Sequence, residues 1–534
     1  MAVKVRLATQ SDAPQWLELL LASLGEDYPA KEVYDLAWVA AELGPESGHE
    51  TWVAEAKDSL HAAISLLKPD DENTNPVVNL GRCLNRPSSY GDGSAEALLQ
   101  KVNQLSRDRQ QMIVARVTAT DTRQQILFES SGFVCAGFQP AKHLLKTRRG
   151  FLFYLSPANP VLVTRSPLSD SLSQISELAT LVLESLKIPT SLTARDGVTG
   201  YPLSSDLTIH DAIYDDFELW RLQAQSTNPV REISSGFNRG AGLMRIQTGS
   251  PFRAMLGQRE AQIVSGLAYF YDEHDRCVRI LDAFASDFLS VGPLLAQVIK
   301  IAHEQLSADY VEVDILMNAR RLLKSAEQLG FVPVAYLPAF CSFQAQYADV
   351  VKMVKLNLLH APEELSLTAH AANVVKLIDS SIQDLKVGVA VLNLLRSLPI
   401  FAGLGDGELR KMGRFFSQKL YRPGEAVFKK GDAGTEAYIV LRGQVDILLD
   451  EKPAPLAMMQ SGQIFGELAF LDRSARLATA VASQPTILLV IQRTAFNDLA
   501  QNEPHLGMVV LGNIAKDLSS KLRRTTNDAF NTGH

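Results

Sequence analysis

The chain has 534 residues, of which 46% are hydrophobic and 21% are charged, the balance of an ordinary globular protein. Its 52 Lys and Arg residues against 59 Asp and Glu give a net charge of −7, which argues against a general nucleic-acid binder with a basic surface. At roughly 150 residues per domain, the length predicts three or four domains.

The cysteines and the apolar runs exclude further classes. Cys83, Cys135, Cys277 and Cys341 lie far apart and form no Cys-x-x-Cys pair, so neither a disulfide framework nor a metal site is predicted. The first residues lack the apolar core of a signal peptide. Charged residues interrupt every apolar run well short of the roughly 20 residues of a membrane helix. We therefore expect a cytoplasmic protein of several domains with no membrane partner.

The first 155 residues alternate between strand and helix patterns, which predicts a mixed α/β fold. Period-two alternation marks the strands and three-to-four-residue spacing marks the helices. Strands are expected at 3–8, 51–56, 60–67, 77–84, 112–118 and 151–155, and helices at 16–24, 94–105 and 123–130.

A similar order follows from about residue 160 to 350. Helices are expected at 173–185, 293–306 and 320–329, and strands at 261–271, 279–285 and 310–316. The segments 116–141 and 314–339 match in detail: each reads as strand, polar turn, helix, Gly-Phe, strand and Pro-Ala. This match predicts a duplicated domain.

The remaining third changes character twice. Residues 356–398 have a helical pattern, and 371–395 fits either a helical hairpin or a dimer seam, without a strict heptad to decide. From 399 to 520, short β-like runs are separated by glycines, which is typical of a small β-barrel or jelly roll. The predicted fold class is therefore α/β plus β.

The segment 465–481 carries the strongest motif. Glu467, preceded by Gly466, stands nine positions ahead of Arg476. A helical turn between them would direct backbone N–H groups into one concavity, which suits a phosphate. The planar guanidinium of Arg476 adds permanent charge, and the Glu467 carboxylate can accept a hydrogen bond from a ribose hydroxyl. The motif predicts recognition of a ribose joined to a phosphate.

This region resembles the cyclic nucleotide-binding domain of protein kinase A regulatory subunits and catabolite activator protein. The resemblance rests on residues 465–469 and 476–479 within a frame at 398–409 and 421–448. It implies that Glu467 binds the ribose 2′-hydroxyl and that Arg476 binds the cyclic phosphate. Gly466, Leu468, Leu477 and Ala478 complete the expected site, with backbone phosphate contacts from Ala478 and Leu468.

Two features refine that expectation. Leu477 stands where sites that prefer cGMP often carry threonine, so cAMP is the favoured ligand and cGMP the alternative. The stretch from the start of the last expected helix onward is too short for a winged helix-turn-helix, so together with the acidic charge no DNA partner is expected.

A weaker motif lies at 86–102, where a glycine-bearing loop separates a strand from a helix. Such a loop can hold a pyrophosphate on the free N–H groups of the helix start. Residues 3–155 resemble the GNAT acyltransferase superfamily, whose coenzyme A loop matches 90–95 here, with Tyr90 replacing the usual Gln or Arg. The resemblance implies an acetyl-CoA site formed by the following loop residues: Gly91, Asp92, Gly93, Ser94 and Ala95.

The catalytic residues stay open. Phe128 occupies the position of a tyrosine that often serves the family as general acid, and a phenyl ring donates no proton. The second copy has only Gly292 in its loop, Pro293 removes a donor, and Ala326 stands at the tyrosine position. Glu55 and His61 are candidates for a general base, Asn79 and Arg82 could polarise a substrate, and no role is singled out for His143.

These resemblances imply four segments: GNAT-like domains at 1–158 and 159–355, a helical linker at 356–398 and a cyclic nucleotide-binding jelly roll at 399–525. Mycobacterial protein lysine acetyltransferases resemble this combination, with a single GNAT domain. The implied function is a GNAT-type N-acetyltransferase under allosteric control by cyclic nucleotide, acting on a protein lysine or a small amine. The alternative is a non-catalytic sensor or scaffold whose GNAT-like domains mediate dimerisation or partner binding. We expect a homo-oligomer in either case.

Overall fold

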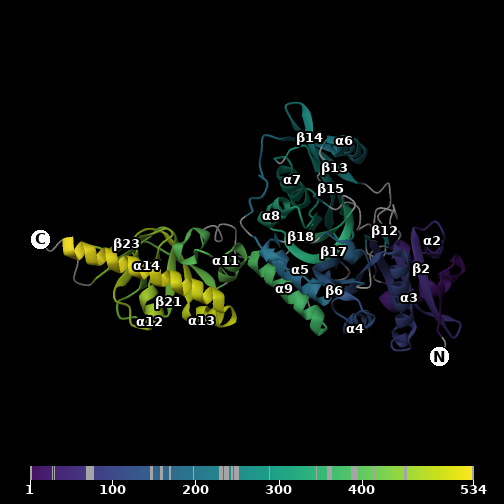
Figure 1. Cartoon of the computed structure of the whole chain (residues 1–534), viewed down its shortest axis with the longest axis horizontal. Coiled ribbons are helices and arrows are strands. Elements are labelled where there is room, and N and C mark those ends of the chain that lie inside the picture. The colour runs from purple at the N-terminus through teal and green to yellow at the C-terminus, as the bar shows by residue number, and fades with distance from the viewer. Residues whose placement is uncertain are drawn as a thin grey trace. The chain divides into compact units, whose positions relative to one another are not determined.

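The computed structural model (Figure 1) describes the following residues: 3–26, 28, 31–67, 77–144, 148–156, 160–166, 170–195, 198–227, 232–233, 240–241, 244–245, 252–287, 289–343, 346–357, 364–385, 395–413, 415–449 and 454–531. The chain divides into two compact units, Met1–Ser381 and Ile382–His534. Each unit is described by itself. No helix among these residues is long and apolar enough to cross a membrane.

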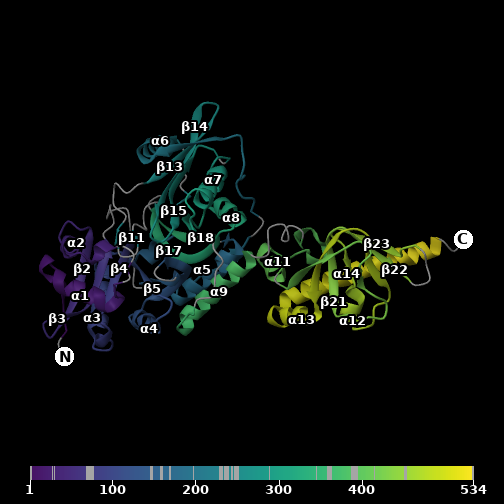
Figure 2. The ribbon, with the colours of Figure 1, turned by 180° about the vertical axis from the view of Figure 1, so that it is seen from behind.

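Unit 1 opens with a first half built of strands and helices in alternation, coloured purple to blue in Figure 2. Its elements are β1 (Lys4–Leu7), α1 (Ala13–Leu24), α2 (Leu36–Glu42), β2 (His49–Ala56), β3 (Ser59–Leu67), β4 (Val77–Asn85), α3 (Ser94–Arg109), β5 (Met112–Thr118), α4 (Thr122–Ser130), β6 (Val134–Leu144) and β7 (Arg148–Leu155). Short 3-10 turns lie at Gln10–Asp12, Lys31–Tyr34 and Pro87–Ser89.

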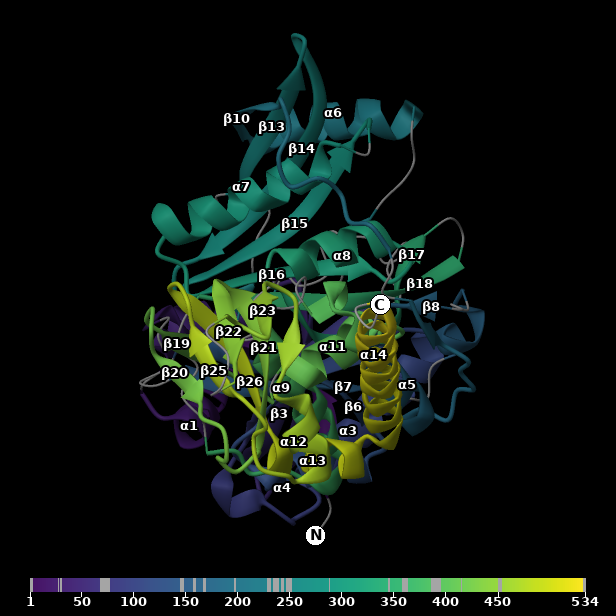
Figure 3. The same ribbon diagram turned by 90° about the vertical axis from the view of Figure 1, so that its left-hand side faces the viewer.

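A second half follows after the turn at Pro160–Thr164, and Figure 3 shows α7 lying along its strands. Its elements are β8 (Asp170–Ser171), α5 (Ser173–Ser185), β9 (Thr193–Ala194), β10 (Thr208–Ile213), α6 (Tyr214–Thr227), β11 (Gly240–Ala241), β12 (Met244–Arg245), β13 (Arg253–Arg259), β14 (Gln262–Asp272), β15 (Cys277–Ala285), α7 (Val291–Glu304), β16 (Tyr310–Leu316), α8 (Arg320–Gln328), β17 (Val332–Phe343) and β18 (Gln346–Leu356). The helix α9 (Ala369–Leu385) comes next.

One 14-stranded sheet runs through both halves, in the order β1-β2-β3-β4-β5-β7-β6-β17-β18-β16-β15-β14-β13-β10. Read inward from one edge, the first half has the order β1-β2-β3-β4-β5-β7-β6. Read inward from the other edge, the second half has the order β10-β13-β14-β15-β16-β18-β17. The strands correspond one to one, so the two halves share one topology. They join where β6 meets β17, at Gly137 opposite Ala335. These two residues are equivalent in the repeat, 198 positions apart. A Cβ atom on Gly137 would lie 2.3 Å from that of Ala335, so the join requires glycine there.

Each half contains a pair of parallel strands whose backbone pairing stops before the first strand of the pair ends. β4 pairs with β5 only from Val77–Met112 to Leu80–Ala115, although β4 continues to Asn85. β15 pairs with β16 only from Cys277–Tyr310 to Ile280–Val313, although β15 continues to Ala285. A bulge interrupts the pairing of β4 with β3 and of β15 with β14 at matching places. We call these regions the first fork and the second fork; each lies before a helix, α3 or α7.

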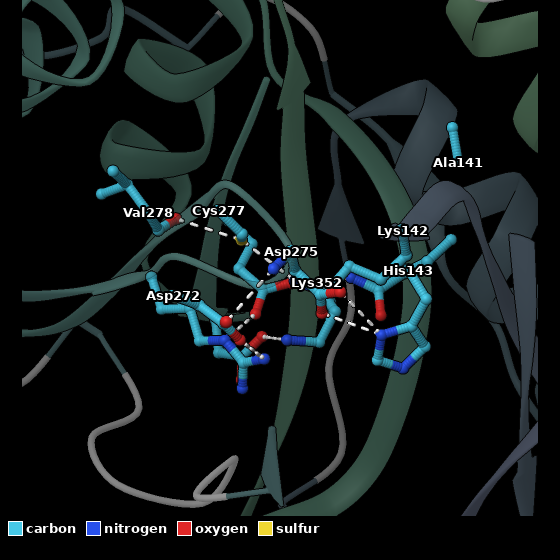
Figure 4. Close-up of polar contacts among 12 residues, drawn as sticks. Ala141, Lys142, His143, Asp272, Asp275, Cys277, Val278 and Lys352 are labelled. Atoms are coloured by element: carbon cyan, nitrogen blue, oxygen red, sulfur yellow. Dashed lines mark hydrogen bonds and ion pairs between the residues drawn. The ribbon is translucent and has the colours of Figure 1, made fainter. Parts of the chain in front are cut away.

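Polar side chains line the join between the halves (Figure 4). The buried Lys142 ammonium lies 3.1 Å from a carboxylate oxygen of Glu312 and 3.0 Å from the Cys277 sulfur. Gln139 donates to the same Glu312 oxygen at 2.8 Å, and His143 Nδ1 lies 2.8 Å from Asp275. We call these six residues the polar seam, because they connect β6 of the first half to the second half.

Unit 2 is a sandwich of two four-stranded sheets, ordered β19-β26-β21-β24 and β20-β25-β22-β23. One apolar cluster fills the space between the sheets, and a second packs one sheet against the helices, including α14. The elements are a 3-10 turn (Pro399–Phe401), α11 (Asp406–Gly413), β19 (Phe416–Tyr421), β20 (Ala426–Phe428), β21 (Glu436–Arg442), β22 (Gln444–Leu448), β23 (Ala457–Gln460), β24 (Ile464–Phe465), α12 (Glu467–Asp472), β25 (Thr479–Ala482), β26 (Thr486–Gln492), α13 (Arg493–Asn502) and α14 (Pro504–Asn531).

Several elements differ from the expectations. The helix expected at 173–185 is α5, but α5 precedes β10, the first strand of the second half's seven in the sheet, and α6 takes the place after that strand. The sequence reading missed α6 because its Leu219 and Leu222 are exposed, which leaves no clear apolar stripe. Part of the expected helical linker, 386–394, lies outside the described residues, so the division at 356 and 398 stays a prediction.

Candidate functional site in unit 2 and a second candidate in unit 1

A tight turn brings the two ends of the 465–481 motif together. Gly466 has a φ of +76°, a left-handed conformation that favours glycine, and α12 begins directly after it. A Cβ atom on Gly466 would lie 2.8 Å from Nη1 of Arg476. The glycine therefore permits both the turn and the close approach of the arginine.

Arg476 is buried in the sandwich, with 4% of its surface exposed. Its Nη1 donates to the Gly466 carbonyl at 2.8 Å and its Nη2 donates to the Glu436 carbonyl at 2.6 Å. The Nε atom is buried without a hydrogen-bond partner. Burial lowers the pKa of Arg476 from its ordinary value, yet a guanidinium stays charged at neutral pH. The chain thus holds a buried cation with an unused donor, an arrangement that suits an anion.

Aromatic rings form the surroundings of this cation. The guanidinium carbon lies 4.2 Å from the ring centre of Phe428. Tyr438 and Phe465 stack with their ring centres 5.2 Å apart, and Phe428 lies 5.7 Å from Tyr438. The rings hold the guanidinium by cation–π attraction and keep water away from it. The sequence reading missed Phe428, Tyr438 and the Glu436 carbonyl, because nothing in their local pattern distinguishes them from ordinary strand residues.

The other predicted site residues divide by exposure. Glu467 is the first residue of α12 and is buried, so the motif brings it beside Gly466 and close to the Arg476 contact. Leu468 and Leu477 expose 48% and 67% of their surfaces. Because their side chains are apolar, only their backbone groups could bind a polar ligand. Ala478 is half-buried and directly precedes β25.

Comparisons with known proteins agree with this geometry. Residues 418–503 match the family model described as "Cyclic nucleotide-binding domain". The chain is 33% identical over 132 residues to the cyclic AMP receptor protein of Thermus thermophilus, covering 24% of this chain and 59% of that protein. It is 29% identical over 141 residues to a cAMP-dependent protein kinase regulatory subunit of Pyricularia oryzae, covering 26% and 32%.

Two solved structures are among those similar to part of this chain. A cyclic nucleotide-binding domain from Methylobacillus flagellatus shares 23% identity, covering 28% of this chain and 86% of that chain, with a TM-score of 0.26. The catabolite activator protein of Thermus thermophilus shares 31% identity, covering 24% and 61%, with a TM-score of 0.23. The chain spans less than two thirds of the length of the first curated relatives it matches.

Unit 2 therefore contains a cyclic nucleotide-binding domain of the type found in protein kinase A regulatory subunits and catabolite activator protein. The chain therefore carries a cyclic nucleotide-binding domain after a large mixed α/β unit. The expected ligand class and the β-sandwich of the C-terminal domain are confirmed.

The second candidate is the loop between β4 and α3. Gly91 and Gly93 have φ values of +85° and +87°, and α3 begins at Ser94. The hydroxyl oxygens of Ser89 and Ser94 are buried without partners, which suits an anionic or strongly polar ligand. Asp92 opposes that reading, because its carboxylate accepts the Ser94 N–H at 2.8 Å and lies 2.6 Å from His61 Nδ1.

The charge of Asp92 persists at neutral pH. Partial burial raises the pKa of its carboxyl, but hydrogen bonds from His61 and from Ser94 outweigh that effect and lower it overall. A carboxylate at a helix start fills part of the space and charge that a pyrophosphate would use. The loop thus offers unpartnered hydroxyls and a competing anion at once.

The remaining candidates are engaged elsewhere. Glu55 accepts from Arg6 at 2.9 Å, and His143 belongs to the polar seam. Arg82 lies on the β4 bulge and donates to Glu42 at 2.5 Å. Phe128 is buried against Phe133 with ring centres 5.1 Å apart. Asn79 lies within the paired part of β4.

The structure adds one group that the sequence reading missed. Glu42 lies 3.0 Å from His49 Nδ1 as well as beside Arg82 at the bulge. Glu42 ends α2, a short helix that the sequence reading did not find. Among the described residues, no group of three or more His, Cys, Asp or Glu residues is arranged to hold a metal ion.

Proposed function

We propose that this chain is a cAMP-regulated N-acyltransferase of GNAT type, with the nucleotide sensor in unit 2 and the acyl-CoA site at the first fork of unit 1. The observation that carries the sensor is the buried Arg476, whose Nε has no partner and whose other donors contact two backbone carbonyls. A cyclic phosphate would accept from this guanidinium in the way that those carbonyls do.

The remaining ligand contacts follow from the turn. Glu467 would accept a hydrogen bond from the ribose 2′-hydroxyl, and the backbones of Gly466, Leu468, Leu477 and Ala478 would contact the phosphate. We favour cAMP over cGMP because Leu477 carries no hydroxyl that could bond to the guanine edge.

Calorimetric titration of the full chain with cAMP tests the sensor. Arg476→Lys keeps the charge but loses the planar fork, so we expect the affinity to fall about 100-fold. Arg442→Ala removes an exposed arginine of the same domain and should leave it unchanged. Leu477→Thr changes an exposed position and should raise cGMP affinity about tenfold. Unchanged cAMP binding by a folded Arg476→Lys variant would refute the assignment.

The acyltransferase half of the proposal rests on the loop and the fork. When bound, acetyl-CoA supplies an activated thioester. The N–H groups of Gly91 to Ala95 and the hydroxyls of Ser89 and Ser94 would hold its pyrophosphate, and the fork would admit its extended arm between β4 and β5. The chain would orient an amine from a protein lysine or a small molecule beside the thioester. Such orientation alone can account for much of the rate of acyl transfer.

A specific observation favours the second candidate, a non-catalytic sensor or scaffold. Phe128 has no proton to donate, and Asp92 competes for the helix start. In that case the α/β unit would serve dimerisation or partner binding. Binding of acetyl-CoA to the full chain separates the two proposals.

A further inference from the structure

The two forks of unit 1 differ in what fills them. We infer that the second fork is closed by the chain itself, through Gly200–Pro202 and Glu232–Ile233, so that each chain takes up one acyl-CoA, at the first fork. We call these two segments the strap. The inference rests on the proposed function for the identity of the ligand, while the strap is argued from contacts within unit 1.

The strap covers the edge of β16 that β15 leaves open. Glu232 accepts the N–H of Leu316 through its backbone carbonyl at 2.9 Å, and Ile233 forms an antiparallel bridge with Ile315. Both contacts lie beyond Val313, the last β16 residue that pairs with β15. Ile233 is buried. The strap therefore takes the position of an added strand in the second fork.

The strap also blocks the start of α7. A Cβ atom on Gly292, the second residue of that helix, would lie 2.0 Å from the Pro202 carbonyl oxygen. The oxygen lies where an anion would approach the helix start. Gly292 is the one glycine left in the loop of the second copy that corresponds to a coenzyme A loop. In the structure, it makes room for the Pro202 carbonyl of the strap.

A third contact fastens the strap to α8. Tyr201 donates its N–H to the Ser325 hydroxyl at 2.7 Å and its hydroxyl to Glu232 at 2.6 Å. Its ring lies over the guanidinium of Arg321, 4.4 Å from ring centre to carbon. The two pieces of the strap thus contact one another, the β16 edge, the start of α7 and the helix α8.

The first fork has the matching groups, and among the described residues it has no isolated bridge like that of Ile233 with Ile315. Thr118 corresponds to Leu316 and Arg123 to Arg321, both 198 positions apart. The Ala119 N–H donates to the Gly150 carbonyl, just as the Met317 N–H donates to the Asp349 carbonyl. Successive N–H groups of a strand point to opposite sides, so the Thr118 N–H points away from β7 and toward the fork, as the Leu316 N–H does in the second half. The guanidinium carbon of Arg123 lies 4.7 Å from the ring centre of Tyr90, a residue of the loop between β4 and α3.

Hydrogen exchange of the full chain, read at single amides, tests the inference with and without acetyl-CoA. We expect the Leu316 amide to exchange at least about 100-fold more slowly than the Thr118 amide in the free protein. Acetyl-CoA should slow exchange at Thr118 and leave Leu316 unchanged. Fast exchange at Leu316, or slowing there on addition of acetyl-CoA, would overturn the strap.

Native mass spectrometry supplies the count. One acetyl-CoA per chain supports the inference, and two would overturn it. If no acetyl-CoA binds and Leu316 is nevertheless protected, the proposed acyltransferase fails while the strap stands. Tyr201→Ala should raise the Leu316 exchange rate about tenfold or more, and Tyr90→Ala, the matched change at the first fork, should leave it unaltered.

Discussion

At the scale of single residues, Asp92 decides how well the first fork can hold a pyrophosphate. Its carboxylate occupies the start of α3 and draws His61 toward itself. A negative charge there repels phosphate, while the unpartnered hydroxyls of Ser89 and Ser94 attract it. The balance between these groups is open to a direct measurement.

We predict that Asp92→Asn increases acetyl-CoA affinity about threefold to tenfold, because the amide still accepts the Ser94 N–H but carries no charge. Calorimetry of the full chain measures this. Asp108→Asn, at the opposite end of α3 and exposed, is the control and should have no effect. A weaker affinity in Asp92→Asn would show that the carboxylate helps the ligand to bind.

At the scale of elements, the polar seam makes the join between the two halves asymmetric, because its buried charges lie on one side of the join and have no charged counterparts on the other. The repeat relates Lys142 to Phe340 and Glu312 to Val114. The buried ion pair therefore has an apolar counterpart on the opposite side of the join. A first half paired with a copy of itself would place Lys142 against Val114 and leave a buried charge unpaired, which is strongly unfavourable.

Replacing Lys142 tests the seam. Burial raises the pKa of Glu312, but Lys142, Lys352 and Arg279 outweigh burial and hold it well below its ordinary value. Lys142→Met leaves this carboxylate short of one partner, so we predict a loss of about 3 kcal/mol at pH 7. The loss should shrink only at pH values well below the ordinary carboxyl range, because Lys352 and Arg279 still hold the pKa of Glu312 down and its protonation is what removes the unpaired charge.

Urea unfolding followed by tryptophan fluorescence measures this loss, since all four tryptophans lie in unit 1. The control is Lys300→Met, whose side chain is exposed and 4.0 Å from Glu304, with an expected change under about 0.5 kcal/mol. Equal losses in both variants would show that the seam contributes no more than a surface pair.

Sequence patterns predicted these elements unevenly. The strand at 112–118 and the helix at 173–185 agree with β5 and α5, because β5 begins with a continuous apolar run and α5 keeps its buried residues at helical spacing. α2 and α6 were missed, since short or weakly amphipathic helices depend on tertiary packing. In the candidate nucleotide site, the spacing of the 465–481 motif predicted Gly466 and Arg476 as neighbours. It did not predict Phe428, Glu436 or the strap, because only long-range packing brings these residues to their partners.

At the scale of the whole molecule, the proposed regulation requires that nucleotide binding in unit 2 change acyl-CoA binding in unit 1. The segment before α9 binds the first half beside the fork: Ser366 donates to the Ala119 carbonyl at 2.9 Å, and Gln125 donates to the Ser366 carbonyl at 2.7 Å. Thr368 in turn donates its N–H to Gln125 and its hydroxyl to Glu129. The chain that leads toward unit 2 is thus fastened to α4, which directly follows β5.

We predict that cAMP changes acetyl-CoA affinity by about fivefold or more, and that acetyl-CoA changes cAMP affinity by the same factor, as linkage requires. Gln125→Ala should bring both factors toward one without changing cAMP affinity in the absence of acetyl-CoA. The control is Gln100→Ala on α3. Four calorimetric titrations per variant give both factors, and an unchanged coupling factor in Gln125→Ala would exclude this route.

The strap has a consequence for the shape of the dose–response curve. Two equivalent open forks would give one chain a pair of like sites, and such a pair can respond cooperatively to its own ligand. With one fork closed from within, a single chain can give only a hyperbolic acyl-CoA curve. Any sigmoidal response would then report contacts between chains, and within one chain the cyclic nucleotide could displace the curve along the concentration axis but not steepen it.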